Sequence, residues 1–327
     1  MIRIENLTKS FGGKNAVDDL SFTVERGEVL GFLGPNGAGK STTMRMITGF
    51  LPATSGKVSV GGFDVVEAPL EAKRLIGYLP ESAPSYPDMT VHGFLSFAAE
   101  MRGLDGDARK KAVARVVELC FLSSVLHQSI DTLSKGYRHR TCLAQALIHD
   151  PDVLILDEPT DGLDPNQKHE VRNLIRDMGR NKVVIFSTHI LEEVDAACSR
   201  AIIIDRGRIV ANGSPAELRA KSEIAGAVTL QLSGAPDAAA KIAALPPVRK
   251  VEPVGAQLRA YPKDALAATQ LARSVIELVN REGWTLESVR TEEGQLDEVF
   301  RRITLPDTAH APSRIVAHAP SNIVVKR

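Results

Sequence analysis

Cysteine is scarce in this sequence, and its three cysteines are far apart. Cys120, Cys142 and Cys198 form neither a CxxC pair nor a spacing typical of a metal site. The pattern therefore excludes a zinc-type cysteine cluster. Each cysteine stands among or beside apolar residues, which favours buried free thiols in a reducing compartment.

The sequence also lacks any apolar run of the roughly 18 to 20 residues that a membrane-spanning helix needs. Residues 1–5 alternate as a strand does and lack the pattern of a signal peptide. If the protein serves a membrane process, another chain must supply the membrane-spanning part.

Excess charge of either sign is absent, because 40 lysines and arginines balance 40 aspartates and glutamates. A formal net charge of zero gives no general attraction to nucleic acid or anionic lipid, although a local basic patch is compatible with it. With 327 residues, 43% of them apolar, the chain is long enough for two globular domains.

Short apolar runs alternate with helical segments, which indicates an α/β fold with a mostly parallel sheet. Residues 29–33, 153–156 and 183–186 are predicted buried strands. Residues 201–204 run through Asp205, Arg206 and Gly207 into residues 208–210, which predicts a hairpin.

A helical stretch at about residues 91–122 lies between the first two of these strands. One face of the predicted helix is apolar, and Asp107 is its expected N-cap. That face is formed by Val113, Val116, Val117, Cys120 and Phe121. The pattern favours a helical subdomain inserted at about residues 82–140.

A domain boundary is expected near residues 219–225, so that residues 1–220 form the first domain. Beyond it, strands are predicted at residues 228–232, 248–254, 257–261 and 284–289, and helices at 236–245, 264–280 and 295–303. This β-α-β-β-α-β order with a trailing helix favours a small split-βαβ, α+β domain over residues 226–304. Residues 305–327 have no periodicity and are expected to form a flexible tail.

A glycine-rich turn follows the first predicted buried strand and precedes a predicted helix. Residues 34–41 fit the pattern GxxxxGKS/T in that context, which is typical of a phosphate-binding loop. We expect backbone N–H groups to surround phosphate oxygens, Lys40 to reach the β- and γ-phosphates, and Ser41 to bind Mg²⁺. The alternative is a glycine-rich turn without function. The predicted nucleotide-binding residues of this segment are Gly34, Pro35, Asn36, Gly37, Ala38, Gly39, Lys40, Ser41 and Thr42.

Two adjacent acids end the second predicted buried strand. Because parallel strands deliver their carboxyl ends to one edge of a sheet, Asp157 and Glu158 are expected beside the phosphate loop. Asp157 would hold Mg²⁺, and Glu158 would act as general base on the attacking water. The competing interpretation is a strand that simply ends in solvated acids.

Three further motifs complete an ordered set that resembles the ABC ATPases over about residues 2–215. Residues 133–140 resemble the signature motif, and residues 161–164, which end at Asp164, resemble the D-loop. Residues 187–189 follow the next strand and put His189 at the position of the switch histidine. The resemblance implies the P-loop NTPase fold of an ABC ATPase, with ATP and Mg²⁺ as cofactors.

The resemblance further implies a head-to-tail pair of ATPase domains. Ser134 and the Gly136 backbone would contact the γ-phosphate held by the other copy, and His189 would bond to that same γ-phosphate. Lys135 and Tyr137 stand where the family usually has Gly and Gln. Lys135 would either add charge near the nucleotide or point to solvent.

At two more positions that match family motifs, this sequence has a different residue from the usual one. Phe11 matches the aromatic residue that stacks on adenine, usually Tyr; the alternative is a core Phe at a strand end. Glu81 stands where the Q-loop has Gln, and an ionised Glu only accepts hydrogen bonds. We therefore predict that Glu81 faces the metal or its water.

The motif variants, with the acidic segment at residues 297–300, resemble one branch of the family, the bacterial export ATPases related to gliding-motility, drug-resistance and copper-maturation transporters. That resemblance implies a polytopic membrane permease as partner. It also implies a cytoplasmic protein held peripherally at the inner face of the membrane. Residues 82–97, with Tyr86, Phe94 and Phe97, would line the groove for the permease, or these aromatic residues pack the inserted subdomain.

The leading hypothesis is therefore the ATP-hydrolysing subunit of an ABC transporter, driving a separate permease and acting as an exporter. The first alternative is a soluble ABC ATPase that acts on ribosomes or DNA. A single set of motifs, no long heptad run and a neutral charge weigh against it, and no nucleic-acid partner is expected. The second alternative is a module that binds ATP without hydrolysing it, which Glu158 and His189 argue against.

Overall fold

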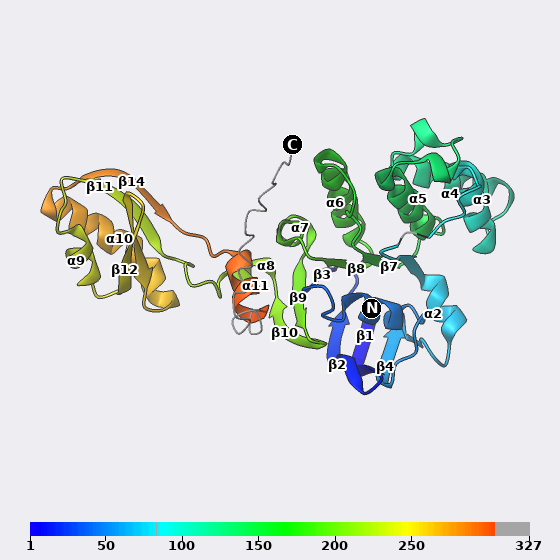
Figure 1. The fold of residues 1–327 in the computed structure, drawn as a ribbon, viewed down its shortest axis with the longest axis horizontal. Coiled ribbons are helices and arrows are strands. Elements are labelled where there is room, and N and C mark those ends of the chain that lie inside the picture. Colours follow the sequence, from blue (N-terminus) through cyan, green and yellow to red (C-terminus); the bar gives the residue numbers. More distant parts are fainter. Residues whose placement is uncertain (83, 305–327) are drawn as a thin grey trace, which may run out of the picture.

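The computed structural model describes residues 1–82 and 84–304, which form three sheets (Figure 1). The largest sheet has the order β10-β9-β3-β8-β7-β6, and its neighbouring strands are parallel except at the β10–β9 edge. Its strands are β3 (Val29–Leu33), β6 (Ile76–Leu79), β7 (Val153–Asp157), β8 (Val183–Thr188), β9 (Arg200–Asp205) and β10 (Arg208–Gly213). The predicted mostly parallel sheet is confirmed, while the tail expected at residues 305–327 lies outside the described residues.

The hairpin predicted around residue 206 closes this sheet. Asp205 pairs with Arg208 across a two-residue turn. Arg206 and Gly207 have φ angles of 48° and 78°, the left-handed conformation that a type I′ hairpin turn requires.

A second, antiparallel sheet of order β2-β1-β4-β5 packs against one face of the large sheet. Its strands are β1 (Ile2–Phe11), β2 (Lys14–Val24), β4 (Ser55–Val60) and β5 (Phe63–Asp64), and α1 (Lys40–Ile47) and α2 (Pro69–Leu75) lie nearby. Ile2 and Ile4 share a buried cluster with Phe32 of β3 and Ile155 of β7. Each such side chain contributes about 1.5–3 kcal/mol when fully buried, so this cluster anchors the strand that leads into the phosphate loop.

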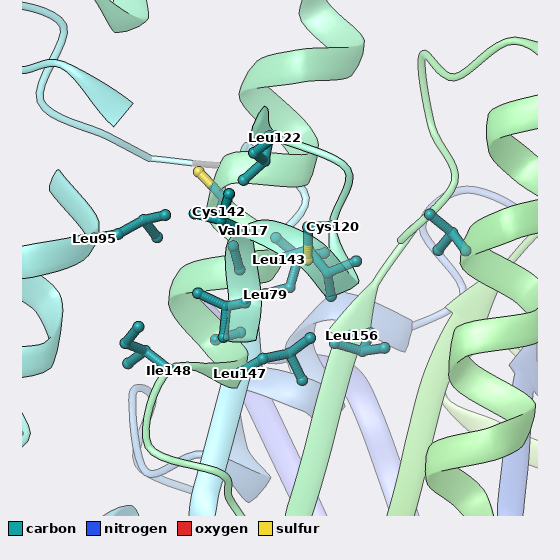
Figure 2. Packing of buried hydrophobic residues seen from close by; sticks show 14 of the residues in the cluster. Leu79, Leu95, Val117, Cys120, Leu122, Cys142, Leu143, Leu147, Ile148 and Leu156 are labelled. Carbon is teal, nitrogen blue, oxygen red and sulfur yellow. The ribbon is translucent and has the colours of Figure 1, made fainter. Parts of the chain in front are cut away.

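Helices cover the opposite face of the large sheet. They are α5 (Lys135–Leu147), α6 (Pro165–Gly179) and α7 (Leu191–Ala197), together with the insertion helices α3 (Val91–Met101) and α4 (Gly106–Leu119). Figure 2 shows that Leu79 and Leu156 of the strands meet Leu143 and Leu147 of α5 and Val117 of α4. The inserted helices therefore share one apolar core with the sheet.

Two details of the predicted insertion are wrong. Asp107 lies inside the first turn of α4, because the helix begins two residues earlier, with Asp105 as N-cap and the Arg109 N–H donating to the Asp105 carbonyl at 3.0 Å. Phe121 is 48% exposed, because α4 ends at Leu119 and Phe121 takes a φ of 54°. The other residues of the predicted face are buried as expected: Val113, Val116, Val117 and Cys120.

The third sheet is antiparallel, has the order β12-β13-β11-β14, and stands apart from the first two in Figure 1. Its elements are β11 (Val228–Ser233), α9 (Ala238–Ala243), β12 (Val248–Val254), β13 (Gln257–Pro262), α10 (Ala265–Glu282) and β14 (Thr285–Thr291). The predicted β-α-β-β-α-β order is present. Asp264 caps α10 by accepting from the Ala267 N–H at 2.8 Å, and Gly283 ends that helix at a φ of 68°.

The last described helix, α11 (Leu296–Thr304), leaves the third sheet and returns to the large sheet. Leu296 lies in a buried cluster with Leu33 of β3, Val194 of α7 and Leu218 of α8 (Pro215–Arg219). The segment before α11 crosses close to α8, since a Cβ on Gly294 would lie 1.8 Å from the Arg219 carbonyl oxygen. The trailing helix therefore packs beside the strand that enters the phosphate loop.

Candidate active site

The glycine-rich turn joins β3 to α1 and depends on its glycines. Gly39, the N-cap of α1, has a φ of 108°, and Gly37 has a φ of 81°. A Cβ on Gly39 would lie 2.5 Å from the Ala16 carbonyl oxygen, and one on Gly34 would lie 2.4 Å from that of Ile204. Substituted residues would therefore force the loop away from its neighbours, so the loop shape follows directly from the sequence.

Lys40 is the first residue of α1 and is only 6% exposed. Its Nζ donates to the Gly34 and Pro35 carbonyl oxygens at 2.8 and 3.2 Å, so the side chain curls back over the loop. Burial lowers its pKa, and the negative charges of Glu158, Asp157 and Glu81 oppose that shift. A buried ammonium facing three carboxylates suits a ligand of high negative charge bound above the loop.

A hollow of about 240 Å³ lies over this loop. Its lining residues are Ala16, Asn36, Gly37, Gly39, Lys40, Ser41, Thr42, Glu81 and Glu158. Ser41 and Thr42 are half-buried, and Glu81 is exposed where the chain leaves β6. Residues from three sequence-distant motifs thus meet in one hollow.

Asp157 ends β7 and is 1% exposed. Its Oδ1 accepts from the Ser187 hydroxyl, whereas its Oδ2 has no hydrogen-bond partner among the described residues. A buried carboxylate oxygen without a donor is costly, and a cation would satisfy it.

Glu158 follows Asp157 with a φ of 53°, a left-handed conformation that turns its side chain out of the strand direction. Its Oε2 lies 2.8 Å from His189 Nδ1, and its Oε1 lies 4.0 Å from Lys40 Nζ. Burial raises the pKa of Glu158, although the neighbouring His189 and Lys40 lower it. A carboxylate with a raised pKa beside a phosphate loop suits proton abstraction.

Phe11 is 52% exposed and lines a separate hollow of about 550 Å³. Lys9 Nζ lies 5.1 Å from the centre of its ring. Ala16 and Gly37 line both hollows, so the two spaces adjoin.

Sequence reasoning missed Arg206, which faces the same hollow as Phe11. The hairpin turn that carries it is held to the phosphate loop, because the Gly207 N–H donates to the Ala38 carbonyl at 2.9 Å. It is also held to β2, because the Asp18 N–H donates to the Gly207 carbonyl at 2.9 Å. The Arg206–Gly207 turn was visible in the sequence, but its docking site was not.

The signature residues form the start of α5, where the Ser134 hydroxyl accepts from the Tyr137 N–H at 3.4 Å. The Lys135 side chain is 64% exposed, and its Nζ forms a surface ion pair with Asp161 Oδ2 at 2.7 Å. The Tyr137 ring lies under the Arg140 guanidinium at 4.4 Å, and its hydroxyl is 3.3 Å from Ser124 Oγ. Asp164 caps α6 by accepting from the Gln167 N–H at 2.9 Å.

None of these signature residues is among the described residues that line the two hollows. The chain therefore brings together the phosphate loop, the two acids, Glu81 and His189, and leaves the signature elsewhere on its surface.

Comparison with known proteins decides the family. A family model described as ABC transporter matches residues 17–161. The linearmycin resistance ATP-binding protein LnrL of Bacillus subtilis (strain 168) is 34% identical over 307 residues, which cover 93% of this chain and 98% of that relative. This chain belongs to the ABC transporter ATP-binding proteins.

Further similarities agree with this family. The Nod factor export ATP-binding protein I of Paraburkholderia xenovorans (strain LB400) is 36% identical over 265 residues, covering 81% of this chain and 86% of that relative. A solved structure described as the ATP binding subunit of an ABC transporter matches with a TM-score of 0.63 at 28% identity, covering 67% of this chain and 92% of the other. The expected P-loop fold and ATPase activity are confirmed, and ATP is the nucleotide of this ABC ATPase.

The donor set of this ABC ATPase fits Mg²⁺, whose octahedral shell usually takes one or two protein ligands besides phosphate oxygens and waters. The Asp157 oxygen that has no partner among the described residues and the Ser41 hydroxyl would be such ligands, and Glu81 lines the same hollow as Ser41. Within residues 1–82 and 84–304, no group of three or more His, Cys, Asp or Glu side chains could hold a metal alone. The same part of the chain contains no helix long and apolar enough to cross a bilayer.

Proposed function

We propose that this ABC ATPase works as a head-to-tail pair that drives a separate membrane permease, as an exporter. The pairing is supported by one observation: within a single chain, the phosphate loop and the signature residues lie apart, so neither copy alone forms a complete ATP site. Lys40 and Glu158 line one hollow, whereas Ser134 and Gly136 lie outside it at the start of α5. A second copy would bring its own α5 N-terminus, with free N–H groups, to the γ-phosphate held on Lys40.

We assign the following roles within one site. The loop N–H groups and Lys40 hold the phosphates, Phe11 stacks on adenine, and Asp157 with Ser41 holds Mg²⁺, toward which Glu81 faces. When bound there, Mg²⁺ would neutralise negative charge on the phosphates. Glu158, in its ionised form, accepts the proton of the attacking water. Because His189 Nδ1 is 2.8 Å from Glu158, its Nε2 is the nitrogen left to bond to the γ-phosphate.

Complementation between two inactive variants tests the pairing. Lys40→Ala disables the phosphate loop, and Ser134→Arg blocks the signature with a bulky side chain. Each variant alone should be inactive, since every site in its own pair contains one defect. Mixed, they should form one intact site per mixed pair and regain a substantial fraction of wild-type ATPase. Activity in Ser134→Arg alone, or no recovery on mixing, would contradict the head-to-tail arrangement.

We propose a groove of about 780 Å³ between α2 and the end of α3 as the permease contact. Phe50, Leu70 and Met101 line it and are 75%, 69% and 71% exposed, and exposed apolar side chains grouped in this way favour a contact site. The basic side chains of Lys73 and Arg74 border it. A permease segment with an apolar face and acidic flanks would suit this groove.

The aromatic residues expected in that role, Tyr86, Phe94 and Phe97, are not among the residues that line this groove, and they divide into two kinds. Phe94 is 5% exposed and packs in the subdomain core, whereas Tyr86 is 54% and Phe97 37% exposed. The Tyr86 and Phe97 rings are edge-to-face at 5.6 Å. We propose that these two exposed rings extend the contact surface.

Purification from membranes tests the transporter role against the soluble alternative. A Phe50→Ser and Leu70→Ser double variant should lose co-purification with a polytopic membrane protein while keeping its folded state and ATP binding. Recovery of ribosomes or DNA instead of a membrane protein with the wild-type chain would favour the soluble ABC ATPase. We propose export because two of the relatives are a linearmycin resistance ATP-binding protein and a Nod factor export ATP-binding protein.

We also propose the domain division 1–220 and 226–304, with the helical subdomain at about 82–140. Separate hydrophobic clusters support it as far as β14, since Val228, Leu230 and Leu271 share a core that contains no residue of the large sheet. The trailing helix α11 is the exception, because Leu296 packs in a cluster with Leu33 of β3. Limited proteolysis should cut first near residues 220–226, and first cuts within α5 or β7 would argue against the division.

A further inference from the structure

Glu193 is a buried acid on α7 that has no place in the mechanism above. It is 1% exposed, and both of its carboxylate oxygens accept hydrogen bonds from hydroxyl groups. Thr188 Oγ1 donates to Oε2 at 2.6 Å, and Thr160 Oγ1 donates to Oε1. Both threonines are themselves buried, at 0% and 3% exposure.

The two threonines belong to the two segments that carry the reacting groups. Thr160 comes two residues after Glu158, on the turn that follows β7. Thr188 is the last residue of β8 and precedes His189 directly. Glu193 therefore joins the loop of the general base to the loop of the switch histidine.

A second hydroxyl links the same two segments on the strand side. The Ser187 hydroxyl donates to Asp157 and also accepts from the Glu158 N–H at 3.0 Å. The Glu158–His189 contact of 2.8 Å thus lies between two cross-links, one through Ser187 and one through Glu193. The Ser187 link joins Asp157 and Glu158 to β8, and the Glu193 link joins Thr160 to Thr188, which come later in the two segments.

We propose that Glu193 is a positioning residue for ATP hydrolysis, which holds the Glu158 and His189 loops at the separation that the reaction needs. The inference rests on the proposed function, because it assumes that Glu158 and His189 act on the same nucleotide. Glu193 lines neither hollow, so it acts through the two threonines rather than on ATP.

The chemistry of the link explains why a carboxylate stands there. Thr188 Oγ1 already accepts from the Ile190 N–H at 3.0 Å, so its own hydrogen must go to another acceptor. An ionised Glu offers acceptor oxygens to both hydroxyls at once, whereas Gln presents one oxygen and one NH₂ group. Glu193→Gln keeps the size of the side chain but replaces one acceptor oxygen with an NH₂ group, so one of the two threonine hydroxyls loses the acceptor for its hydrogen.

Steady-state ATPase kinetics on Glu193→Gln, with Glu192→Gln as matched control, test the proposal. Glu192 is the exposed neighbour on the same helix. We expect kcat of Glu193→Gln to fall about 10- to 100-fold, the loss typical of a catalytic group displaced by about 1 Å. The KM for ATP should stay within about threefold of wild type, because binding depends on the phosphate loop. Glu192→Gln should match wild type in both constants.

Thr160→Val and Thr160→Ser separate positioning from stability, and they decide the matter if Glu193→Gln does not fold. Valine removes the hydroxyl at equal size, and serine restores it. Thr160→Val should reproduce the kcat loss, Thr160→Ser should recover most of the activity, and the Glu193→Gln/Thr160→Val double variant should be no slower than the worse single variant. Wild-type kcat in folded Thr160→Val, equal loss in Thr160→Ser, or additive losses in the double variant would overturn the proposal.

Glu158→Gln, assayed in parallel, distinguishes this inference from the proposed function. If Glu158→Gln hydrolyses ATP at the wild-type rate, the catalytic assignment itself fails. If Glu158→Gln is inactive while Glu193→Gln and Thr160→Val keep the wild-type kcat, only the role of Glu193 fails.

Discussion

Asp157 at the end of β7 and Glu292 after β14 are both acids at the margin of a sheet, yet their surroundings differ. Glu292 accepts from Arg290 Nε at 3.0 Å and from Arg259 at 3.3 Å, and from the Thr229 hydroxyl as well. Asp157 is 1% exposed and keeps one oxygen without a partner among the described residues. The large sheet thus leaves an acid incompletely satisfied, and the third sheet does not.

The pKa directions of two glutamates follow the same division. Burial raises the pKa of Glu158, and the nearby His189 and Lys40 only partly oppose it. Burial would also raise the pKa of Glu292, but hydrogen bonds from Thr229 and Arg290 outweigh it and the pKa is lowered. A polar network whose groups all have hydrogen-bond partners within the protein indicates a structural role. A buried polar group without such a partner indicates a binding site for a ligand.

Replacing Glu158 and Glu292 with glutamine, one at a time, should give the largest difference in ATPase rate between the two regions. Glu158→Gln should lower kcat about 10²- to 10⁴-fold, the usual contribution of a general base, with little loss of stability. Glu292→Gln should leave the ATPase rate unchanged and lower the free energy of unfolding by about 1–3 kcal/mol, because it weakens hydrogen bonds to charged groups. ATPase assays and urea unfolding measure both. A comparable ATPase loss in Glu292→Gln would break the division between the two sheets.

Truncating one leucine in each region should separate their stabilities. Leu296→Ala opens the cluster of α11 beside the phosphate-loop strand, and Leu271→Ala opens the core of the third sheet. Each should cost about 2–5 kcal/mol. Hydrogen exchange should show the loss around β3 and α7 for Leu296→Ala, and within β11–β14 for Leu271→Ala. Identical exchange patterns would mean that the two regions unfold as one unit.

Removing the unsatisfied acid should weaken the response to magnesium. Asp157→Asn should raise the Mg²⁺ concentration needed for half-maximal ATPase about 10- to 100-fold. ATP binding without magnesium should persist, since the phosphate loop is intact. Magnesium titrations at fixed ATP measure this, and an unchanged midpoint would assign the metal to other residues. Glu252→Gln, on the third sheet, is the control and should leave the midpoint unchanged.

Titration of histidine should act on the first region, because residues 226–304 contain no histidine. Burial, and then the Arg102 charge, lower the pKa of His149 to about 4. Between about pH 6.5 and 4 the unfolded chain binds a proton at this residue that the folded chain does not, so stability falls as the pH falls, by at most about 1.4 kcal/mol per pH unit. His149→Gln should reduce that slope in unfolding experiments. An equal slope in both proteins would assign the effect to another group.

Local sequence determined those parts of this protein whose cause lies within a few residues. The glycine pattern at 34–41 dictates the loop and Lys40, the apolar run before Asp157 and Glu158 dictates a buried strand ending in acids, and the period of the segments after residue 226 dictates their order. These features depend on backbone conformation and on which face of an element is apolar. They can therefore be predicted from the sequence without knowledge of the tertiary structure.

Tertiary structure decided what depends on contacts between distant residues. Glu193 follows another glutamate on a short helix and resembles a solvated charge, until folding buries it against Thr160, 33 residues away. Lys135 finds Asp161, and Leu296 finds Leu33, through packing of elements that share no sequence pattern. The local sequence pattern determines secondary-structure propensity and hydrophobic periodicity. It does not determine which side chains come into contact when the sheets and helices pack together.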